Sequence, residues 1–409
     1  MDNYFPSLNK FLTSKIGAFF IILPFVKPAP ELTGSFDVIF DIWKLFAASL
    51  ILVGCIRTLH KASHILYWIA GLQVVMLLST IIHNADFKAA IVQVVSVISI
   101  CIYFDYFIRT DPNRAISTLM LPLIFMSIMT AISMFVFYPE GMYVVGDELS
   151  GEVVKNNFLW GFDNSSIFNF IPGMYLLGLY ALIENNKIIY RKTIFVLLFI
   201  SLAFLYVFSI TAFIGCFSIL LAFVFILVIK KKANLLTTKN LIILAVVLSL
   251  VLLIFNDRLS ILMEFSKLTD KFYSIKARFI IWDCVINWWK KSPLIGYGIE
   301  DKLLIIGKLN LDHPHNYFMD VLYRSGLIGI VVVVVLFYKL ISGKWSDSHI
   351  NAFSAVAFFV LLVIAQFDFY NDHYMFYPIM IVVMYSKNLV ITKTNKSELD
   401  NLQIYESSK

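Results

Sequence analysis

Long, nearly continuous apolar runs recur along the chain, and they constrain its fold more than any other feature. A membrane-spanning helix needs about 20 mostly apolar residues in succession, whereas a soluble core cannot hide so much apolar surface. Hydrophobic residues make up 60% of the 409 positions and charged residues 15%, which excludes a soluble enzyme, a disordered chain and a collagen-like fibre. The runs are continuous rather than alternating, which argues against a β-barrel. Twelve spans are predicted, at 11–26, 36–56, 65–82, 87–108, 116–138, 162–183, 193–209, 211–229, 240–255, 316–341, 350–367 and 374–391.

The positions of the basic residues predict which side of the membrane each loop occupies, because short cytoplasmic loops are enriched in Lys and Arg. With the N-terminus placed inside, inner loops and tails hold 19 of the 33 basic residues, whereas the short outer loops hold three. Both termini are therefore expected to be cytoplasmic, and segments 139–161 and 256–314 are expected outside. The predicted units are transmembrane helices one to nine at 1–255, the long outer loop at 256–314, helices ten to twelve at 315–391 and a cytoplasmic tail at 392–409.

The middle of the long outer loop, residues 276–291, has the pattern of a helix with two different faces. Arg278 shares one face with Trp282, Val285 and Trp289. The opposite face carries the polar residues Lys276, Asp283, Asn287 and Lys290. One interpretation is an interfacial helix with aromatic anchors and a snorkelling arginine. The other is that Arg278, in a membrane-facing apolar stripe, binds a lipid phosphate or pyrophosphate with two hydrogen bonds.

Residues 312–316 read Asp-His-Pro-His-Asn, just before the tenth predicted span. Pro314 suits the first position of a helix, and Asp312 or His313 could cap that helix. His315 would then lie in the first turn, where the helix dipole favours a neutral ring that can accept a proton. The same helix start attracts phosphate, which has the opposite effect on the ring. The simpler alternative is that His315 is a cap or a satisfied polar residue.

The residues around His315 form an ordered set of short motifs. His315 and Asn316 are followed by nine residues and then by Gly326-Leu-Ile-Gly329. This order resembles the signature of the O-antigen ligase and polymerase superfamily. Upstream, Arg278-Phe-Ile-Ile-Trp282 and Pro293-Leu-Ile-Gly-Tyr-Gly298 are similar to the outer-loop pattern of that family. The motif resemblance covers residues 278–329, and the twelve spans with a large outer loop before the tenth are similar over the whole chain.

The resemblance implies an all-α, GT-C-like polytopic membrane protein of about twelve transmembrane helices with a large helical periplasmic loop. The activity that it implies is that of a metal-independent glycosyltransferase, without a cofactor, that uses glycans linked to undecaprenyl pyrophosphate. The implied place is the bacterial inner (cytoplasmic) membrane, with the active site in the periplasm. The implied partners are lipid-linked oligosaccharides, the lipid bilayer and a protein that regulates chain length, with no nucleic acid.

By the same resemblance, Arg278 holds the donor pyrophosphate, and His315 is a general base or orients the acceptor. Asn316 matches the polar residue that follows the histidine, which makes it a candidate substrate-binding residue. Gly326 and Gly329 match helix-packing glycines, in keeping with the small residues found where membrane helices meet.

The sequence departs from the ligases of the family at one place. After the turn between the seventh and eighth spans, residues 209–215 contain no arginine near Thr211. This departure counts against a ligase more than against a polymerase, which is the more variable group. The cations that could replace the arginine are Arg258, Lys267, Lys271, Lys276 and Arg324, of which we predict Lys276, Arg324 and Arg258 as substrate-binding.

Further polar residues near the outer ends of the last spans have two interpretations each. Asp320 and Arg324 stand four residues apart on a predicted helix, so they can pair, or the arginine can face a water-filled cavity. Asp368, Asp372 and His373 fit a solvated loop, and they could instead line the mouth of the site. The histidines, acids and four cysteines do not assemble a metal-ligand set.

The function predicted from these residues is polymerisation of surface-polysaccharide repeat units. A lipid-pyrophosphate-linked glycan would be transferred to a sugar hydroxyl of another lipid-linked unit, with His315 and Arg278 as catalytic residues. The first alternative is an O-antigen ligase, which differs only in its acceptor, lipid A-core. The second alternative is a polysaccharide transporter or flippase, whose usual internal repeats and midplane charges are not evident here.

Overall fold

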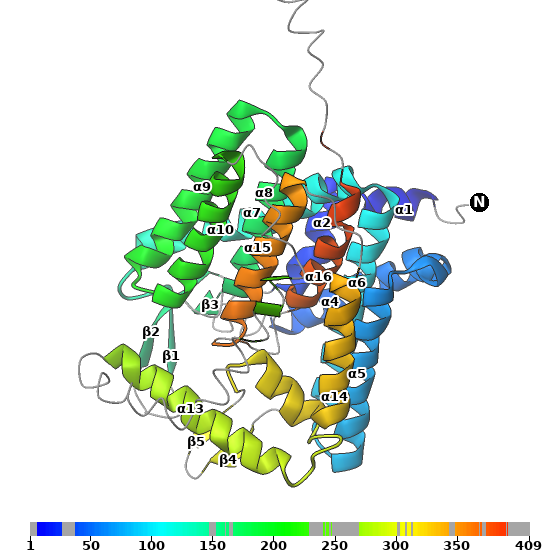
Figure 1. The fold of residues 1–409 in the computed structure, drawn as a ribbon, viewed down its shortest axis with the longest axis vertical. Coiled ribbons are helices and arrows are strands. Elements are labelled where there is room, and N and C mark those ends of the chain that lie inside the picture. Colours follow the sequence, from blue (N-terminus) through cyan, green and yellow to red (C-terminus); the bar gives the residue numbers. More distant parts are fainter. Residues whose placement is uncertain are drawn as a thin grey trace, which may run out of the picture.

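The computed structural model has the helical architecture that the apolar runs predict (Figure 1). The described α-helices overlap predicted spans, except the helix at Asp270–Trp289, which lies in the predicted outer loop. It describes residues 6–26, 37–146, 153–159, 161–162, 167–228, 240–241, 243–244, 247, 270–300, 303–306, 309–311, 314–342, 348–367, 369, 374–389 and 391.

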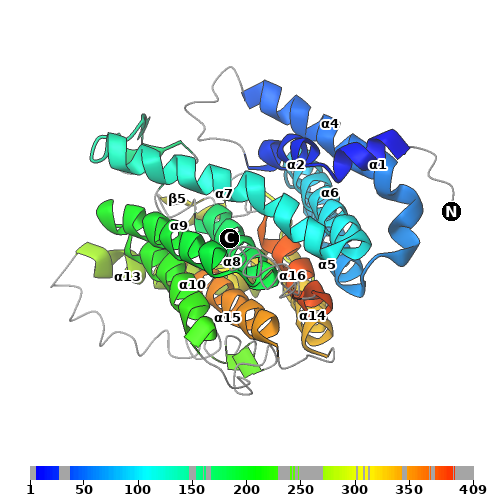
Figure 2. The same ribbon diagram turned by 90° about the horizontal axis from the view of Figure 1, so that it is seen from above.

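The helices follow one another up and down the bundle. The α-helices are α1 (Pro6–Leu12), α2 (Lys15–Ile22), α4 (Asp37–Cys55), α5 (His64–His83), α6 (Phe87–Thr110), α7 (Pro112–Phe137), α8 (Ile167–Glu184), α9 (Lys187–Tyr206), α10 (Ile210–Val228), α13 (Asp270–Trp289), α14 (Tyr317–Ile341), α15 (His349–Ile364) and α16 (Phe376–Tyr385). Short 3-10 helices are η1 (Leu23–Phe25), η3 (Ile56–Lys61) and η5 (Ser386–Asn388). Figure 2 shows α4 at the periphery of the bundle and α8 and α16 inside it.

Among the described helices, seven are long and apolar enough to cross a membrane, namely α5, α6, α7, α9, α10, α14 and, from Val38, α4. Three shorter apolar segments, Lys15–Phe25, Phe170–Glu184 and His349–Ile364, coincide with further predicted spans. The protein is therefore an all-α, multi-pass membrane protein. The number of twelve spans stays a prediction, since most of the run at 240–255 lies outside the described residues.

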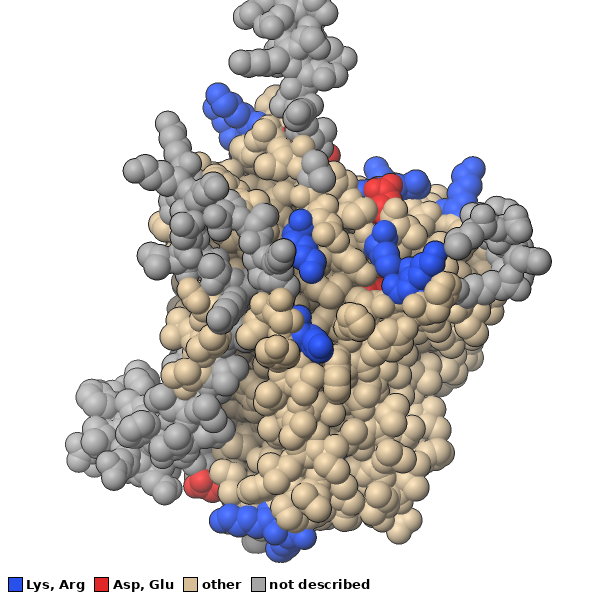
Figure 3. All heavy atoms as spheres, turned by 45° about the vertical axis from the view of Figure 1, so that its right-hand side comes forward, with Lys and Arg blue, Asp and Glu red and all other residues tan. Residues whose placement is uncertain are grey.

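The surface of the bundle is apolar between its two ends. Figure 3 shows one face, on which a broad band without Lys, Arg, Asp or Glu separates basic side chains near one end from a few charges near the other. Large hydrophobic side chains of α4, such as Ile39, Ile42 and Phe46, are exposed on the molecular surface. So much exposed apolar surface is stable in lipid, whereas in water it would promote association.

Two extramembrane features lie together at the lower end of the bundle in Figure 1. The first is an antiparallel sheet of β1 (Tyr143–Gly146), β2 (Val153–Phe158) and β3 (Gly161–Phe162). The second contains α13 and the antiparallel pair β4 (Leu303–Ile306) and β5 (Leu309–Leu311). The long outer loop was predicted to be helical, and β4–β5 corrects this in part. Both features lie at the end that the positions of the basic residues predict to be outside.

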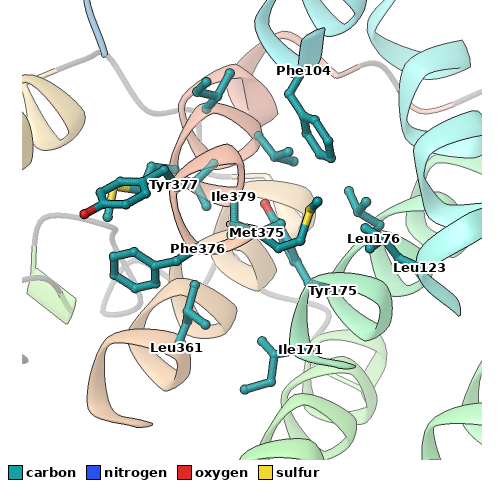
Figure 4. Close-up of a cluster of buried hydrophobic side chains, with 14 of the residues drawn as sticks. Phe104, Leu123, Ile171, Tyr175, Leu176, Leu361, Met375, Phe376, Tyr377 and Ile379 are labelled. Carbon is teal, nitrogen blue, oxygen red and sulfur yellow. The ribbon is translucent and has the colours of Figure 1, made fainter. Parts of the chain in front are cut away.

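The core joins the last helices to the middle of the chain (Figure 4). Phe104 of α6, Leu123 of α7 and Leu176 of α8 are buried against α16 and the residues just before it. The ring of Phe376, at the start of α16, lies 4.8 Å from that of Tyr317, the first residue of α14. The tightly packed core therefore fixes the start of α14, where His315 and Asn316 were singled out from the sequence.

Candidate functional site

Helix α14 is interrupted at Gly326, whose backbone angles of φ 59° and ψ −156° are not helical. Figure 1 shows α14 as two segments that meet at an angle. The break deprives the amides that follow it of partners within the helix. Leu327 N donates instead to Pro293 O at 2.9 Å, and Ile328 N donates to Leu294 O at 3.1 Å. The outer loop thus completes the hydrogen bonding of a membrane helix.

The same break exposes two carbonyl groups on the other side of Gly326. Tyr323 O accepts from Tyr297 N at 2.7 Å, and Arg324 O accepts from Gly298 N at 2.9 Å. Segment 293–298 is therefore fastened to α14 by backbone hydrogen bonds on both sides of the break. In lipid, where water cannot satisfy such groups, each unpaired one would cost several kcal/mol.

The glycines of the two motifs permit this close approach. A Cβ atom on Gly296 would meet the carbonyl oxygen of Tyr323, and one on Gly326 would meet the backbone of Leu294. Gly326 and Gly329 were predicted to be helix-packing glycines. Gly326 is instead the break itself, at a positive φ that favours glycine. Gly329 lies buried, and a Cβ there would meet a side chain one turn earlier in α14.

Replacing Gly326 with alanine is expected to destabilise the protein by at least about 1–2 kcal/mol, because a left-handed backbone costs that much for an L residue. Contact between the new methyl group and Leu294 adds to the cost. The measurement is the melting temperature of the purified protein in detergent. Gly71→Ala is the control, since a Cβ at Gly71 in α5 meets nothing within 4 Å. Equal effects of the two replacements would contradict the role assigned to the break.

Residues 293–300, called the docked loop from here on, also contact the end of α5. Ile299 N donates to Thr80 Oγ1 at 2.8 Å, and Ile299 O accepts from Asp86 N at 3.1 Å. A Cβ on Gly298 would meet the backbone of Thr80, so this glycine too permits a close approach. The loop is therefore held between α5 and α14, which lie side by side in Figure 1.

Helix α13 packs on the first part of α14. Ile281, Trp282 and Val285 form a buried cluster with Met319 and Tyr323. The predicted face of the outer-loop helix is therefore confirmed, but it contacts α14 rather than the membrane that was expected. Of the polar residues predicted on the opposite face, Asp283, Asn287 and Lys290 are exposed.

Trp282 links the two sequence-predicted catalytic residues. Its Nε1 donates to Pro314 O at 2.9 Å, and Pro314 directly precedes His315. Arg278 lies one turn before Trp282 on the same helix, about 6 Å along the axis at 1.5 Å per residue. Arg278 is partly buried, and its Nε is shielded from solvent. The structure therefore brings Arg278 and the His315 segment to one end of the bundle around a single tryptophan.

His315 lies outside α14, which corrects the expectation that it occupies the first helical turn. The helix begins at Tyr317, and its cap is Asn316 rather than Asp312 or His313, which lie outside the described residues. His315 is partly buried and has a φ of 54°, a left-handed conformation that is uncommon for residues other than glycine. Such conformations persist where the surroundings impose them, and they are frequent at functional sites.

Asn316, the next residue, is fixed at both ends of its side chain. Its Oδ1 accepts from Phe318 N at 2.9 Å and Met319 N at 3.1 Å, and its Nδ2 donates to Gln366 O at 3.0 Å. The side chain is 2% exposed, so both ends of the amide are engaged inside the protein. Its geometry fits a residue that holds His315 in place, and the predicted direct contact with substrate stays a prediction.

Asp320 and Arg324 form the predicted i,i+4 pair. Arg324 Nε lies 2.8 Å from Asp320 Oδ1, and both side chains are 2% exposed. The Nη1 of Arg324 is buried and has no hydrogen-bond partner among the described residues. A buried pair with one unsatisfied donor is a suitable place for a further anionic or hydroxyl group.

Glu300 was not singled out from the sequence, although it follows Pro293-Leu-Ile-Gly-Tyr-Gly298 by two residues. Its Oε2 accepts from the hydroxyl of Tyr323 at 3.2 Å. Partial burial raises the pKa of the Glu300 carboxyl, and the Tyr323 hydroxyl, Arg324 and His83 lower it in part. Its nearness to α14 depends on the docked loop, which no local pattern reveals.

Several predicted site residues are not placed. Arg258, Lys267, Asp368, Asp372 and His373 lie outside the described residues, and the side chains of Lys271 and Lys276 are not described. The turn expected near Thr211 lies slightly earlier, where Phe208 has a φ of 58° between α9 and α10. Within the described part of the chain, no three His, Cys, Asp or Glu side chains gather to hold a metal.

Comparison with known proteins gives one family. The family described as O-Antigen ligase matches residues 194–334, which include most of α9, all of α10 and α13, the docked loop and most of α14. No curated protein and no solved structure matches. The match supports a glycosyltransferase-like activity of the ligase or polymerase kind, without distinguishing the two. Over residues 194–334, it confirms the resemblance to the O-antigen ligase and polymerase superfamily that Arg278, His315 and the glycine motifs carry.

Proposed function

We propose that the protein is a polymerase of surface polysaccharides that joins lipid-linked repeat units at the outer face of the bacterial cytoplasmic membrane. One observation carries the proposal: the Trp282–Pro314 hydrogen bond holds the helix of Arg278 against the segment of His315. A cation that binds phosphate well and a group that accepts a proton thus share one end of the bundle, where a lipid headgroup lies.

In the proposed reaction, the donor is a glycan linked through its anomeric carbon to undecaprenyl pyrophosphate. A hydroxyl of the acceptor glycan attacks that carbon, a new C–O bond forms and the bond to the pyrophosphate oxygen breaks. The hydroxyl proton passes to His315, and the leaving undecaprenyl pyrophosphate carries away the electron pair. Arg278 stabilises the negative charge that develops on the pyrophosphate. Such stabilisation is worth several kcal/mol when the guanidinium is already oriented toward the charge.

Arg324 supplies a second positive group in this proposal, in place of the arginine that is missing near Thr211. It lies on α14, two turns after Asn316, and its Nη1 is buried without a partner among the described residues. Lys276, two residues before Arg278, and Arg258 are further candidates for contacts with the substrate. A partner protein that regulates chain length belongs to the same proposal.

A ligase is the second candidate, because the matching family is described as O-Antigen ligase. The two activities use the same donor and differ in the acceptor. Purified protein is incubated with lipid-linked repeat units, in one reaction alone and in another with lipid A-core. A ladder of lengthening glycans in the first reaction is expected for the polymerase. Product that forms only on lipid A-core would replace the polymerase by the ligase.

A further inference from the structure

Glu300 lies at the end of the docked loop, next to the broken part of α14. The backbone just before it is fixed on two sides, by Gly298 N to Arg324 O at 2.9 Å and by Ile299 N to Thr80 Oγ1 at 2.8 Å. Its own Oε2 accepts from the Tyr323 hydroxyl at 3.2 Å. The carboxylate is therefore held in a defined position rather than on a freely moving loop.

One oxygen of this carboxylate remains available. Among the described residues, Tyr323 is the hydrogen-bond partner of Glu300, through Oε2, and Oε1 accepts no hydrogen bond. The side chain is only partly buried, so a molecule at the outer end of the bundle can reach it. A carboxylate has acceptor capacity for several hydrogen bonds, and sugar hydroxyls are the matching donors.

Glu300 is connected to the proposed site through Tyr323. The Tyr323 ring packs in the same buried cluster as Trp282, and the indole of Trp282 donates to Pro314, next to His315. Tyr323 also stacks on Tyr297 of the docked loop, with ring centroids 5.4 Å apart. One tyrosine thus joins the carboxylate, the loop and the cluster that positions His315.

The charges around Glu300 fit a neutral sugar better than a phosphate. A pyrophosphate would be repelled by a carboxylate, so Glu300 itself suits the neutral acceptor, whereas the donor headgroup belongs with the cation Arg278. Burial raises the pKa of the Glu300 carboxyl, and the nearby Arg324 and His83 counter part of that rise by favouring the charged form, which binds hydroxyl donors more strongly than the neutral form.

We propose that Glu300 is an acceptor-binding residue, whose Oε1 accepts a hydrogen bond from a hydroxyl of the incoming acceptor sugar and orients that sugar toward His315. The inference rests on the proposed glycan transfer and adds to it a residue that distinguishes acceptor from donor. It makes Glu300 a determinant of acceptor specificity.

The test separates the two substrates. Mild acid releases the free glycan from lipid-linked repeat units, and this glycan, without pyrophosphate, can serve only as the acceptor. Transfer from intact lipid-linked units to the free glycan is followed with each substrate varied in turn. Glu300→Gln keeps the shape of the side chain and removes its charge. This change is expected to raise the KM for the free glycan by about tenfold or more, because one hydrogen bond to a charged group is lost. The kcat and the KM for the donor should stay within twofold of their values in the unaltered protein.

Two further variants keep the outcome interpretable. Tyr323→Phe removes the hydroxyl that bonds Oε2 and keeps the ring, so a smaller rise in the same KM is expected. Glu300→Asp keeps the negative charge but shortens the side chain by one methylene group. Its KM for the free glycan is expected to lie between those of the unaltered protein and Glu300→Gln. Glu184→Gln, at the other end of the bundle on α8, is the matched control and should change none of the three constants. Melting temperatures identify any variant that fails to fold, in which case the remaining two decide.

The results separate this inference from the function on which it rests. Normal transfer by the unaltered protein, together with an acceptor KM within twofold in Glu300→Gln, would overturn the role of Glu300 alone. A large fall in kcat at an unchanged acceptor KM would likewise overturn it, because the residue would then act in the chemical step. No transfer to any acceptor by the unaltered protein would overturn the proposed function and the role of Glu300 with it.

Discussion

His315→Ala is expected to lower the rate of glycan transfer by about 10²–10⁴-fold, the usual loss when a positioned proton acceptor is removed. The backbone of His315 is strained, and the residue lies between Pro314, whose carbonyl accepts from Trp282, and the Asn316 cap. No neighbouring segment can therefore easily bring another proton acceptor to the same place. The measurement is the initial rate of lengthening of lipid-linked repeat units by the purified variant.

The control for this change is His349→Ala, which removes a histidine at the start of α15, at the other end of the bundle. Its rate should equal that of the unaltered protein. The Asn316 cap should keep the fold of the His315 variant intact, which the melting temperature checks. A folded His315→Ala protein that elongates glycans normally would refute the role given to this residue.

Arg278→Ala is expected to reduce transfer by about 10²–10³-fold, as the loss of one aimed group that stabilises developing charge typically does. Arg278→Lys should recover only part of the activity, because a lysine keeps the charge but not the two parallel hydrogen bonds. The measurement is the rate of release of undecaprenyl pyrophosphate together with product length.

Lys290→Ala is the matched control, since it removes an exposed cation directly after the end of α13. If the two replacements lowered the rate equally, a general effect of positive charge at the membrane surface would explain the result, and Arg278 would have no specific role. Binding of the donor in the absence of an acceptor, weakened in Arg278→Ala and unchanged in His315→Ala, would separate the two assignments further.

The membrane helices were predictable because apolar length is a local property of the sequence. The predicted run at 87–108 and helix α6 at Phe87–Thr110 begin at the same residue, and caps such as Asp86 are equally local. The hairpins of β1–β2 and β4–β5 were missed, because short strands in polar outer segments leave no strong periodic pattern.

The face of α13 that carries Arg278, Trp282 and Val285 was also predictable, but its neighbour was not. An apolar stripe next to a membrane suits lipid and protein equally, and only the packing of α14 decides between them. The predicted position of His315 in the first helical turn was wrong for a similar reason. Asp312, His313 and Asn316 are all acceptable caps, and Asn316 prevails through its distant hydrogen bond to Gln366.

The break in α14 shows most directly what a local pattern leaves out. Glycine is frequent in membrane helices, so Gly326 gave no sign that the helix would stop there. The amides of Leu327 and Ile328 find partners some thirty positions upstream, in Pro293 and Leu294. Glu300 was overlooked for the same reason, because its importance comes only from the loop that reaches α14.

The hydrogen bonds that Leu327 and Ile328 donate to the outer loop also affect how the protein assembles. The segment that contains Pro293 and Leu294 precedes α14 in the chain, so it is synthesised before the tenth predicted span. Until residues 293–298 are docked, the bent span carries unpaired amides and carbonyls among hydrocarbon tails, which makes this state costly. Stable insertion of that span is therefore coupled to docking of residues 293–298, because the same hydrogen bonds serve both.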